Sequence, residues 1–165
     1  MQGTIVQVNI SHGGMPKTPI AEGVVSELGI EGDHHNHPEF HGGAEKAILL
    51  IAIEIIEELK MQGYPLYPGA MGENLTTSGI DIRALRIGDR VRAGGVELEL
   101  TKIRKPCRQL RVYGETLGET IYDPAVKAGD TTSPRWAMSG FYARVTAPGT
   151  VRAGDAISVT RASVP

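Results

Sequence analysis

The stretch LRIGDRVRAGGVELELTKIRKPC, residues 85–107, is the most informative about the fold. From residue 96 to residue 103 it alternates apolar and polar side chains, which is the pattern of a half-buried strand. The pair Gly94-Gly95 separates this run from residues 85–94, and two glycines between two such runs are typical of a β-hairpin. The second strand leads directly to Pro106-Cys107, so we expect the only cysteine of the chain to lie just beyond a strand end.

Short apolar runs separated by glycine and proline fill the rest of the chain. The 21 glycines and 10 prolines among 165 residues indicate many tight turns. Further strands are expected at residues 4–10, 23–28, 47–51, 74–77, 140–145 and 155–160, with loops at 11–19, 29–43 and 130–140. Helical periodicity begins at Ala52 and stops at Gly63, and residues 109–128 are expected to contain one or two short helical turns. The pattern predicts one mainly β domain over residues 1–165, a β-barrel or a barrel-like α+β fold with one clear helix.

Composition and charge exclude several classes of protein. A hydrophobic content of 41% with 22% charged residues is typical of a globular chain rather than a disordered one. A formal net charge of −2 argues against a nucleic-acid partner. The longest apolar stretch, residues 47–53, is far shorter than the roughly 20 residues that span a bilayer, so no membrane partner is expected. The beginning, MQGTIVQVNI, lacks the features of a secretory signal, which favours a cytoplasmic protein.

Cys107 lies in a basic segment, TKIRKPCRQLR, residues 101–111. The cations of this segment are Lys102, Arg104, Lys105, Arg108 and Arg111. A thiolate, rather than a thiol, is the nucleophile and the soft metal ligand, and nearby cations favour the ionised form. A buried structural cysteine with solvated basic neighbours is the alternative, because cysteine is among the most often buried residue types. Because the chain as a whole has a negative net charge, this cluster of cations is a local feature and predicts a local anion site.

Four of the five histidines gather in GDHHNHPEFHGG, residues 32–43. They are His34, His35, His37 and His41, and Asp33 and Glu39 lie among them. Imidazole and carboxylate are competent zinc ligands, but the spacing matches no helical pair such as HExxH, and a solvated histidine-rich loop is the alternative. In His41-Gly42-Gly43 the glycines let the backbone approach a ligand, and Lys46 adds a donor. A phosphate group would suit this turn, although a plain turn before a strand is the simpler interpretation.

The order of the motifs closely resembles the MOSC domain, the module named for the C-terminal part of molybdenum cofactor sulfurases. The motifs are GD-x7-HGG-x2-KA, MGENLTT-x-GID, LRIGDRVRAGGVELELTKIRKPC, GFYARV and a closing AGD-x-I. They run from about residue 23 to residue 159, so the chain is similar to a stand-alone MOSC protein. The resemblance implies a β-barrel with a conserved cysteine, which Cys107 matches through R-K-P-C. The large pyridoxal-phosphate portion of the sulfurases is not seen, and His34, His35 and His37 are not part of the family pattern.

The resemblance also implies what the cysteine does. Family members are thought either to carry sulfur on it or to bind the molybdenum cofactor, molybdopterin, with its sulfur ligating molybdenum. We therefore expect an oxidoreductase that reduces N-hydroxylated compounds with electrons from a separate reductase. The first alternative is a sulfur carrier that receives a persulfide on Cys107 from a cysteine desulfurase, and the second is a non-catalytic anion- or metal-binding domain. Pyridoxal phosphate binding is a further association of the family.

The residues that match the family pattern form the candidate site. Cys107 is the expected catalytic residue and molybdenum ligand, and the expected cofactor-binding residues are His41, Gly42, Gly43, Lys46, Glu73, Asn74, Arg104 and Lys105. The cofactor is a pterin dithiolene with a phosphate and is therefore anionic, which suits the cations around Cys107. A soft thiolate also suits a metal that sulfur already binds. Asn74 is expected to hydrogen-bond the edge of the pterin.

Overall fold

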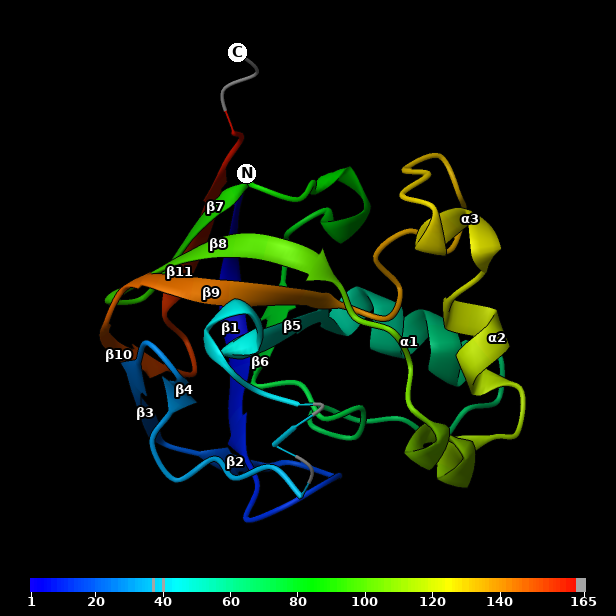
Figure 1. Cartoon of the computed structure of the whole chain (residues 1–165), viewed down its shortest axis with the longest axis horizontal. Coiled ribbons are helices and arrows are strands. Elements are labelled where there is room, and N and C mark those ends of the chain that lie inside the picture. Colours follow the sequence, from blue (N-terminus) through cyan, green and yellow to red (C-terminus); the bar gives the residue numbers. More distant parts are fainter. Residues whose placement is uncertain (37, 40, 163–165) are drawn as a thin grey trace.

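Seven strands close into a β-barrel in the computed structural model, which describes residues 1–36, 38–39 and 41–162 (Figure 1). The strands are β1 (Gln2–Ile10), β5 (Ile48–Ala52), β6 (Leu75–Ser78), β7 (Arg90–Ala93), β8 (Val96–Ile103), β9 (Phe141–Ala147) and β11 (Ala156–Thr160). Their order around the ring is β1-β11-β7-β8-β9-β5-β6, and β6 pairs with β1 to complete it. All neighbours are antiparallel except β5 and β6. Closure leaves the ring without an edge strand, and the expected mainly β barrel is confirmed.

The hairpin of β7 and β8 forms where the sequence predicts it. Ala93 pairs with Val96, so Gly94 and Gly95 make a two-residue turn, and Gly94 has a φ of +56° that suits glycine. The first strand begins at Arg90 rather than at residue 85. Residues before it form a turn, in which the Arg86 backbone N–H donates to Asp89 Oδ2 at 2.8 Å.

Four short strands lie beside the ring. They are β2 (Thr18–Ile20), which pairs with the end of β1, and a small sheet of β10 (Gly149–Arg152), β3 (Glu22–Ser26) and β4 (Gly29–Ile30). The prediction of loops was wrong for β2 and β4, and β10 was not predicted. Strands of two to four residues are too short to show a clear alternation of apolar and polar side chains.

The α-helices α1, α2 and α3 gather on one side of the barrel (Figure 1). The longest, α1 (Ile53–Met61), buries Ile55, Ile56 and Leu59. The others are α2 (Leu117–Ile121), α3 (Pro124–Lys127) and the 3-10 helices η1 (Ala44–Lys46), η2 (Ile82–Ala84) and η3 (Arg108–Tyr113). One clear helix with a few short helical turns is therefore confirmed. Within the described ranges, each helix falls short of the length and apolar character needed to cross a membrane.

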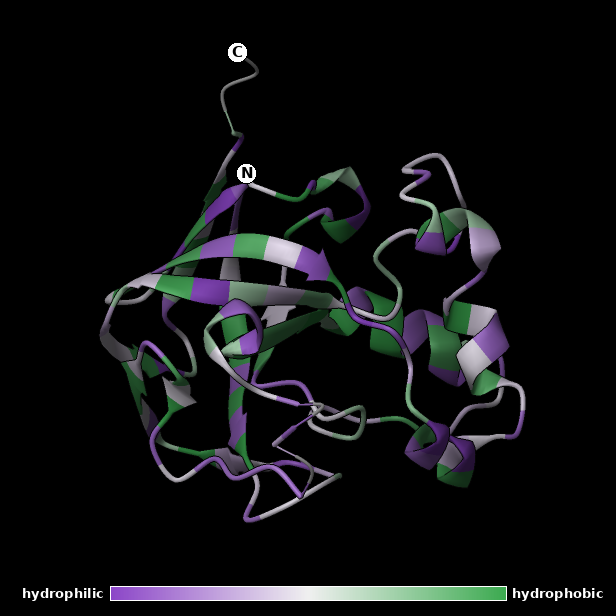
Figure 2. Cartoon of the chain, in the orientation of Figure 1, coloured by the Kyte–Doolittle hydropathy of each residue, from purple (hydrophilic) through white to green (hydrophobic). Residues whose placement is uncertain are grey.

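The two faces of the barrel wall have different roles. Leu50, Leu100 and Phe141 line a small cavity inside the barrel with apolar residues from the other strands. Figure 2 shows the resulting alternation of hydrophobic and hydrophilic residues along β8 and β9. Side chains alternate along a strand, so Leu49 and Tyr142, which pair across β5 and β9, point to the outer face. The candidate site is built on this outer face rather than inside the barrel.

Shortening one interior side chain tests the packing of the barrel. Ile157 of β11 is 2% exposed and borders the internal cavity, so Ile157→Val should lower the free energy of unfolding by about 1 kcal/mol. Urea denaturation of both proteins measures this difference. Val112→Ala, at a side chain that is 78% exposed, is the control and should leave the midpoint unchanged. Equal effects of the two substitutions would contradict this account of the core.

Candidate functional site

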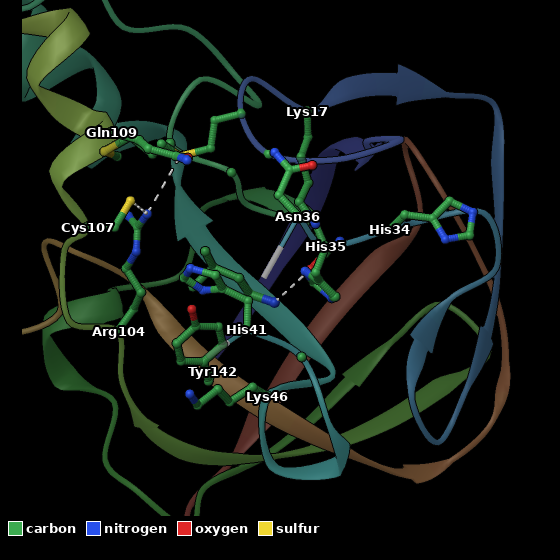
Figure 3. A pocket seen from close by; sticks show the side chains of 17 residues that line it. Lys17, His34, His35, Asn36, His41, Lys46, Arg104, Cys107, Gln109 and Tyr142 are labelled. Carbon is green, nitrogen blue, oxygen red and sulfur yellow. Dashed lines mark hydrogen bonds between the residues drawn. The ribbon is translucent and has the colours of Figure 1, made fainter. Parts of the chain in front are cut away.

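A pocket on the outer face of the barrel brings most of the candidate residues together (Figure 3). It contains about 610 Å³ of empty space, including the part that is open to solvent. Its walls come from two loops, from β5, from the segment before β6, from the segment after β8 and from β9. The lining residues include Met15, Lys17, His34, His35, Asn36, His41, Gly42, Lys46, Leu49, Met71, Gly72, Asn74, Arg104, Cys107 and Tyr142. Cys107 and Arg104 lie across the pocket from Lys17 and His35.

Arg104 is held rigidly beside the thiol. Its backbone N–H donates to the carbonyl of Gly140 at 2.9 Å, and its own carbonyl accepts from Ser139 Oγ at 2.6 Å. The side chain is 4% exposed, and Nη2 lies 3.9 Å from Cys107 Sγ and 3.8 Å from Met15 Sδ. Among the described residues, Nη1 has no hydrogen-bond partner although it is buried. A buried charged group with an unpaired donor is costly, and Arg104 lines the pocket, so its guanidinium charge favours an anion there.

A buried ion pair forms the opposite wall. Lys17 Nζ lies 2.5 Å from Asp33 Oδ2, and the two side chains are 7% and 4% exposed. The Asp33 carboxylate also accepts from Asn74 Nδ2 at 2.8 Å and from the Ser11 backbone N–H at 2.9 Å. Burial lowers the pKa of Lys17, and the Asp33 carboxylate opposes this shift. Lys17 was not among the predicted site residues, because a lone lysine in a loop of glycine and proline carries no pattern.

Asn74 mainly supports this wall through hydrogen bonds within the protein. Its Oδ1 accepts from the Leu49 backbone N–H at 3.1 Å, and its Nδ2 donates to Asp33 and to the carbonyl of Asn9. Both amide hydrogens are therefore used within the protein. Asn74 does line the pocket, but its expected contact with a pterin edge is limited to the remaining lone pair of Oδ1.

Glu73 lies behind the pocket instead of lining it. Its side chain is fully buried, and Oε1 accepts from the Gly69 backbone N–H at 2.6 Å and from Thr76 Oγ1 at 3.0 Å. Oε2 is buried without a partner among the described residues. Burial raises the pKa of Glu73 above its ordinary value, and the charge of Arg104 opposes this shift only partly. Its position fits a support for the pocket rather than a direct ligand.

The raised pKa of Glu73 makes a prediction about stability. Below its ordinary pKa of 4.5 the carboxyl is protonated in both the folded and the unfolded chain. As the pH rises, the unfolded chain ionises first, so stability is lost up to the folded-state pKa. Glu73→Gln removes this titration. The free energy of unfolding of the variant, relative to that of the wild type, should therefore increase as the pH rises above 4.5. Urea denaturation across the pH range measures the difference, and a difference that stays constant with pH would contradict a raised pKa.

The remaining predicted residues are divided between the pocket and its surroundings. His41, Gly42 and Lys46 line the pocket, and Lys46 Nζ lies 5.8 Å from the centre of the Tyr142 ring. Gly42 has a φ of +84°, and an added Cβ would lie 2.8 Å from His35 Cδ2, so a side chain would not fit there. Gly43 precedes η1 and lies outside the pocket lining, and Lys105 faces a different recess.

The described histidines of the loop can act as hydrogen-bond donors to the pocket. Burial, helped by the charge of Lys17, lowers the pKa of His35, and the rings of His34 and His12 stack with centres 6.3 Å apart. Among the described residues there is no group of three His, Cys, Asp or Glu side chains that could hold a metal ion. His37, one of the proposed ligands, lies outside the described residues.

Tyr142 and Met15 are among the other pocket residues that the sequence analysis did not predict. Tyr142 could have been found, because alternation in GFYARV places it on the face opposite to Phe141. Burial raises the pKa of Tyr142, so the phenol stays protonated at neutral pH. Met15 could not have been found from the sequence, because its approach to Arg104 depends on the path of a loop. Arg144, two residues beyond Tyr142, faces outward and forms ion pairs with Glu45 and Glu99 at 3.3 and 2.6 Å.

Comparison with known proteins agrees with this arrangement. The family model described as the MOSC domain matches residues 37–158, which include the cysteine segment and much of the pocket. The chain belongs to the MOSC domain family. Membership associates this MOSC protein with the molybdenum cofactor in general terms.

Similar proteins extend the comparison. YiiM of Escherichia coli (strain K12) is 31% identical over 138 residues, which are 79% of this chain and 55% of YiiM. A protein named "Reductase" from Gibberella moniliformis (strain M3125 / FGSC 7600) is 30% identical over 148 residues, which are 85% of this chain and 24% of that protein. The crystal structure of the YUAD protein from Bacillus subtilis shares the fold, with a TM-score of 0.72, 23% identity and 96% of both chains covered. The MOSC protein thus spans about half the length of YiiM and about a quarter of the fungal protein.

Proposed function

We propose that this MOSC protein binds the molybdenum cofactor in the pocket, with the Cys107 sulfur as a ligand to molybdenum, and reduces N-hydroxylated compounds with electrons from a partner reductase. The observation that carries the proposal is the buried guanidinium of Arg104 at the pocket wall: its Nη2 lies 3.9 Å from the thiol, and its Nη1 has no hydrogen-bond partner among the described residues. An anionic group that binds beside a buried guanidinium stabilises its charge and its unpaired donor. Cys107 beside it supplies the soft sulfur that molybdenum in a dithiolene favours.

The other walls fit the same ligand. Lys17, Lys46 and the backbone at Gly42 offer donors to an anionic pterin and its phosphate, and the Tyr142 ring offers an apolar surface. His35 and His41 line the same pocket and can add imidazole donors. The family association with molybdenum cofactor and the relative named "Reductase" support a redox role over simple anion binding.

The chemistry that the bound cofactor would supply is the transfer of two electrons to the N–O bond. Cleavage of an N-hydroxylated amine also consumes two protons and gives the amine and water. Lys17 Nζ is suited to hold one of these protons, because it lines the pocket and its burial lowers the pKa. Asp33 fixes the position of that ammonium group through their short ion pair.

Activity of the cofactor-loaded protein tests the proposal. The protein is produced in a host that makes the cofactor and is given benzamidoxime with reduced methyl viologen as the electron donor. Formation of benzamidine by the wild type is the expected result. Absence of turnover in protein that carries molybdenum and pterin would overturn the reductase proposal, with an unrelated molybdenum enzyme from the same host as the control for the assay.

Accessibility of the thiol supports a sulfur carrier as the second candidate. Cys107 is half-buried and borders both the pocket and a second, more open recess, so a donor protein could reach it. A cysteine desulfurase would then leave an additional sulfur on Cys107, which intact-protein mass spectrometry detects. Lack of this mass increase, while a known acceptor is labelled in parallel, would rule against this role. Pyridoxal phosphate binding remains a prediction of the family resemblance.

A further inference from the structure

Tyr142 holds a fixed position in the wall of the pocket. It lies in β9, where it pairs with Leu49 of β5 on one side and with Lys102 of β8 on the other. A strand that is paired along both edges positions a side chain more precisely than a loop does. Figure 3 shows the hydroxyl of Tyr142 pointing away from Lys46 and toward the end of the pocket that holds Arg104. The hydroxyl is therefore a rigidly placed polar group inside the pocket.

Cationic side chains lie around Tyr142. Lys46 Nζ lies 5.8 Å from the centre of its ring. Lys102 is its direct cross-strand partner, so both side chains leave the same face of the barrel wall. The backbone N–H of Arg104 donates to the carbonyl of Gly140 and continues this register, which places the Arg104 side chain on that face as the diagonal neighbour of Tyr142. Cations in these positions stabilise the phenolate that remains after the phenol gives up its proton.

The phenol of Tyr142 nevertheless holds its proton at neutral pH. Burial raises its pKa, and the thiolate charge of Cys107 acts in the same direction. The charge of Arg104 and a hydrogen bond with its side chain oppose this rise only partly. A group that is protonated at working pH, and whose conjugate base has cations beside it, has the properties of a general acid.

We propose that the Tyr142 hydroxyl donates the proton that the leaving oxygen takes up when the N–O bond of an N-hydroxylated substrate is cleaved. The proposal rests on the proposed function, which supplies the reaction. The N–O bond breaks as the substrate receives two electrons, which the reduced cofactor would supply. The oxygen takes the proton of Tyr142 and leaves as water, and the nitrogen takes a proton from Lys17. Tyr142 is assigned to the oxygen because it lies on the side of Arg104 and Cys107, whereas Lys17 lies across the pocket (Figure 3). The phenolate and the neutral lysine then regain their protons from solvent.

Tyr142→Phe tests the proposal, because it removes the hydroxyl and keeps the ring. Turnover of benzamidoxime per bound molybdenum should fall about a hundredfold or more, while KM and the cofactor content should change little. Tyr122→Phe, at a half-buried tyrosine outside the pocket, is the matched control and should turn over like the wild type. Full turnover by Tyr142→Phe would overturn the proposal and leave the proposed function intact, which fails only where the loaded wild type is itself inactive. Loss of cofactor with unchanged turnover per molybdenum would also overturn it, and would make Tyr142 a binding residue.

The acidity of the phenol gives a second measurement, which a purely structural role would not affect. Trifluorotyrosine at position 142 keeps the ring and the hydroxyl but has a more acidic phenol, so kcat should decline at a lower pH than in the wild type. In the cofactor-free protein, the absorbance of the fluorinated phenolate reports its pKa without any turnover. Arg104→Met should raise this pKa, because the guanidinium favours the phenolate. A decline of kcat that stays at the same pH after fluorination, or a phenol pKa that Arg104→Met leaves unchanged, would contradict the proposal.

Discussion

Cys107→Ala is expected to lower the rate of N-hydroxyl reduction about a thousandfold or more, as is typical when one member of a catalytic unit is lost. The expected loss follows from the position of Cys107, which borders the pocket beside the buried Arg104. It is also the only cysteine in the chain, so no other thiol can replace it. Met15, the other sulfur near Arg104, is a thioether and cannot supply a thiolate. Turnover of benzamidoxime by wild type and variant, normalised to protein concentration, measures the difference.

A stability measurement separates this effect from misfolding. Cys107 is half-buried and makes no disulfide, so Cys107→Ala should keep its free energy of unfolding within about 1 kcal/mol of the wild type. Cys107→Ser is the closer match in size and should be equally inactive, because a hard oxygen replaces a soft sulfur. Substantial turnover by either folded variant would exclude the cysteine as the essential ligand.

Arg104→Met is expected to have opposite effects on cofactor retention and on stability. The cofactor content after purification should fall about ten- to a hundredfold, because the variant lacks the buried donor next to the thiol. The cofactor-free protein should be as stable as the wild type or more stable, because methionine fills similar space without an unpaired buried charge. Molybdenum analysis gives the first quantity, and urea denaturation gives the second.

The matched control for this prediction is Arg104→Lys. It keeps the positive charge but replaces the planar guanidinium with a single ammonium group, so part of the cofactor should be retained. Cofactor content equal to that of the wild type in Arg104→Met would contradict a role of Arg104 in binding. A large loss of stability in the cofactor-free variant would instead assign Arg104 a structural role.

The barrel was predictable because its strands carry their own signals. The run at residues 96–103 alternates, Gly94-Gly95 supplies a turn, and the apolar run at residues 47–51 indicates a strand that is buried on both faces. The order of strands in the ring was not predictable in this way. The parallel pairing of β5 with β6 and the closure of β11 on β1 join segments that are far apart in the sequence.

The site was predictable only where a motif carried it. Cys107, Arg104 and His41 lie in motifs that resemble those of the MOSC family, and the structure brings these three residues to one pocket. Lys17 and Met15 reach the same pocket through the path of a loop, which no local pattern encodes. Lys105 was grouped with Arg104 because they are adjacent in sequence, but Lys105 lines a second recess instead of the pocket. The separation of a residue from Cys107 in the sequence does not show which of the two recesses its side chain lines.

The central claim, that Cys107 holds the molybdenum cofactor in this pocket, is tested most directly by the metal and pterin content of protein from a cofactor-producing host. The wild type should carry about one molybdenum and about one pterin per chain, and Cys107→Ala should carry far less of both under the same conditions. A wild type that carries no more of either than Cys107→Ala, while a control enzyme from the same cells is fully loaded, would contradict the claim.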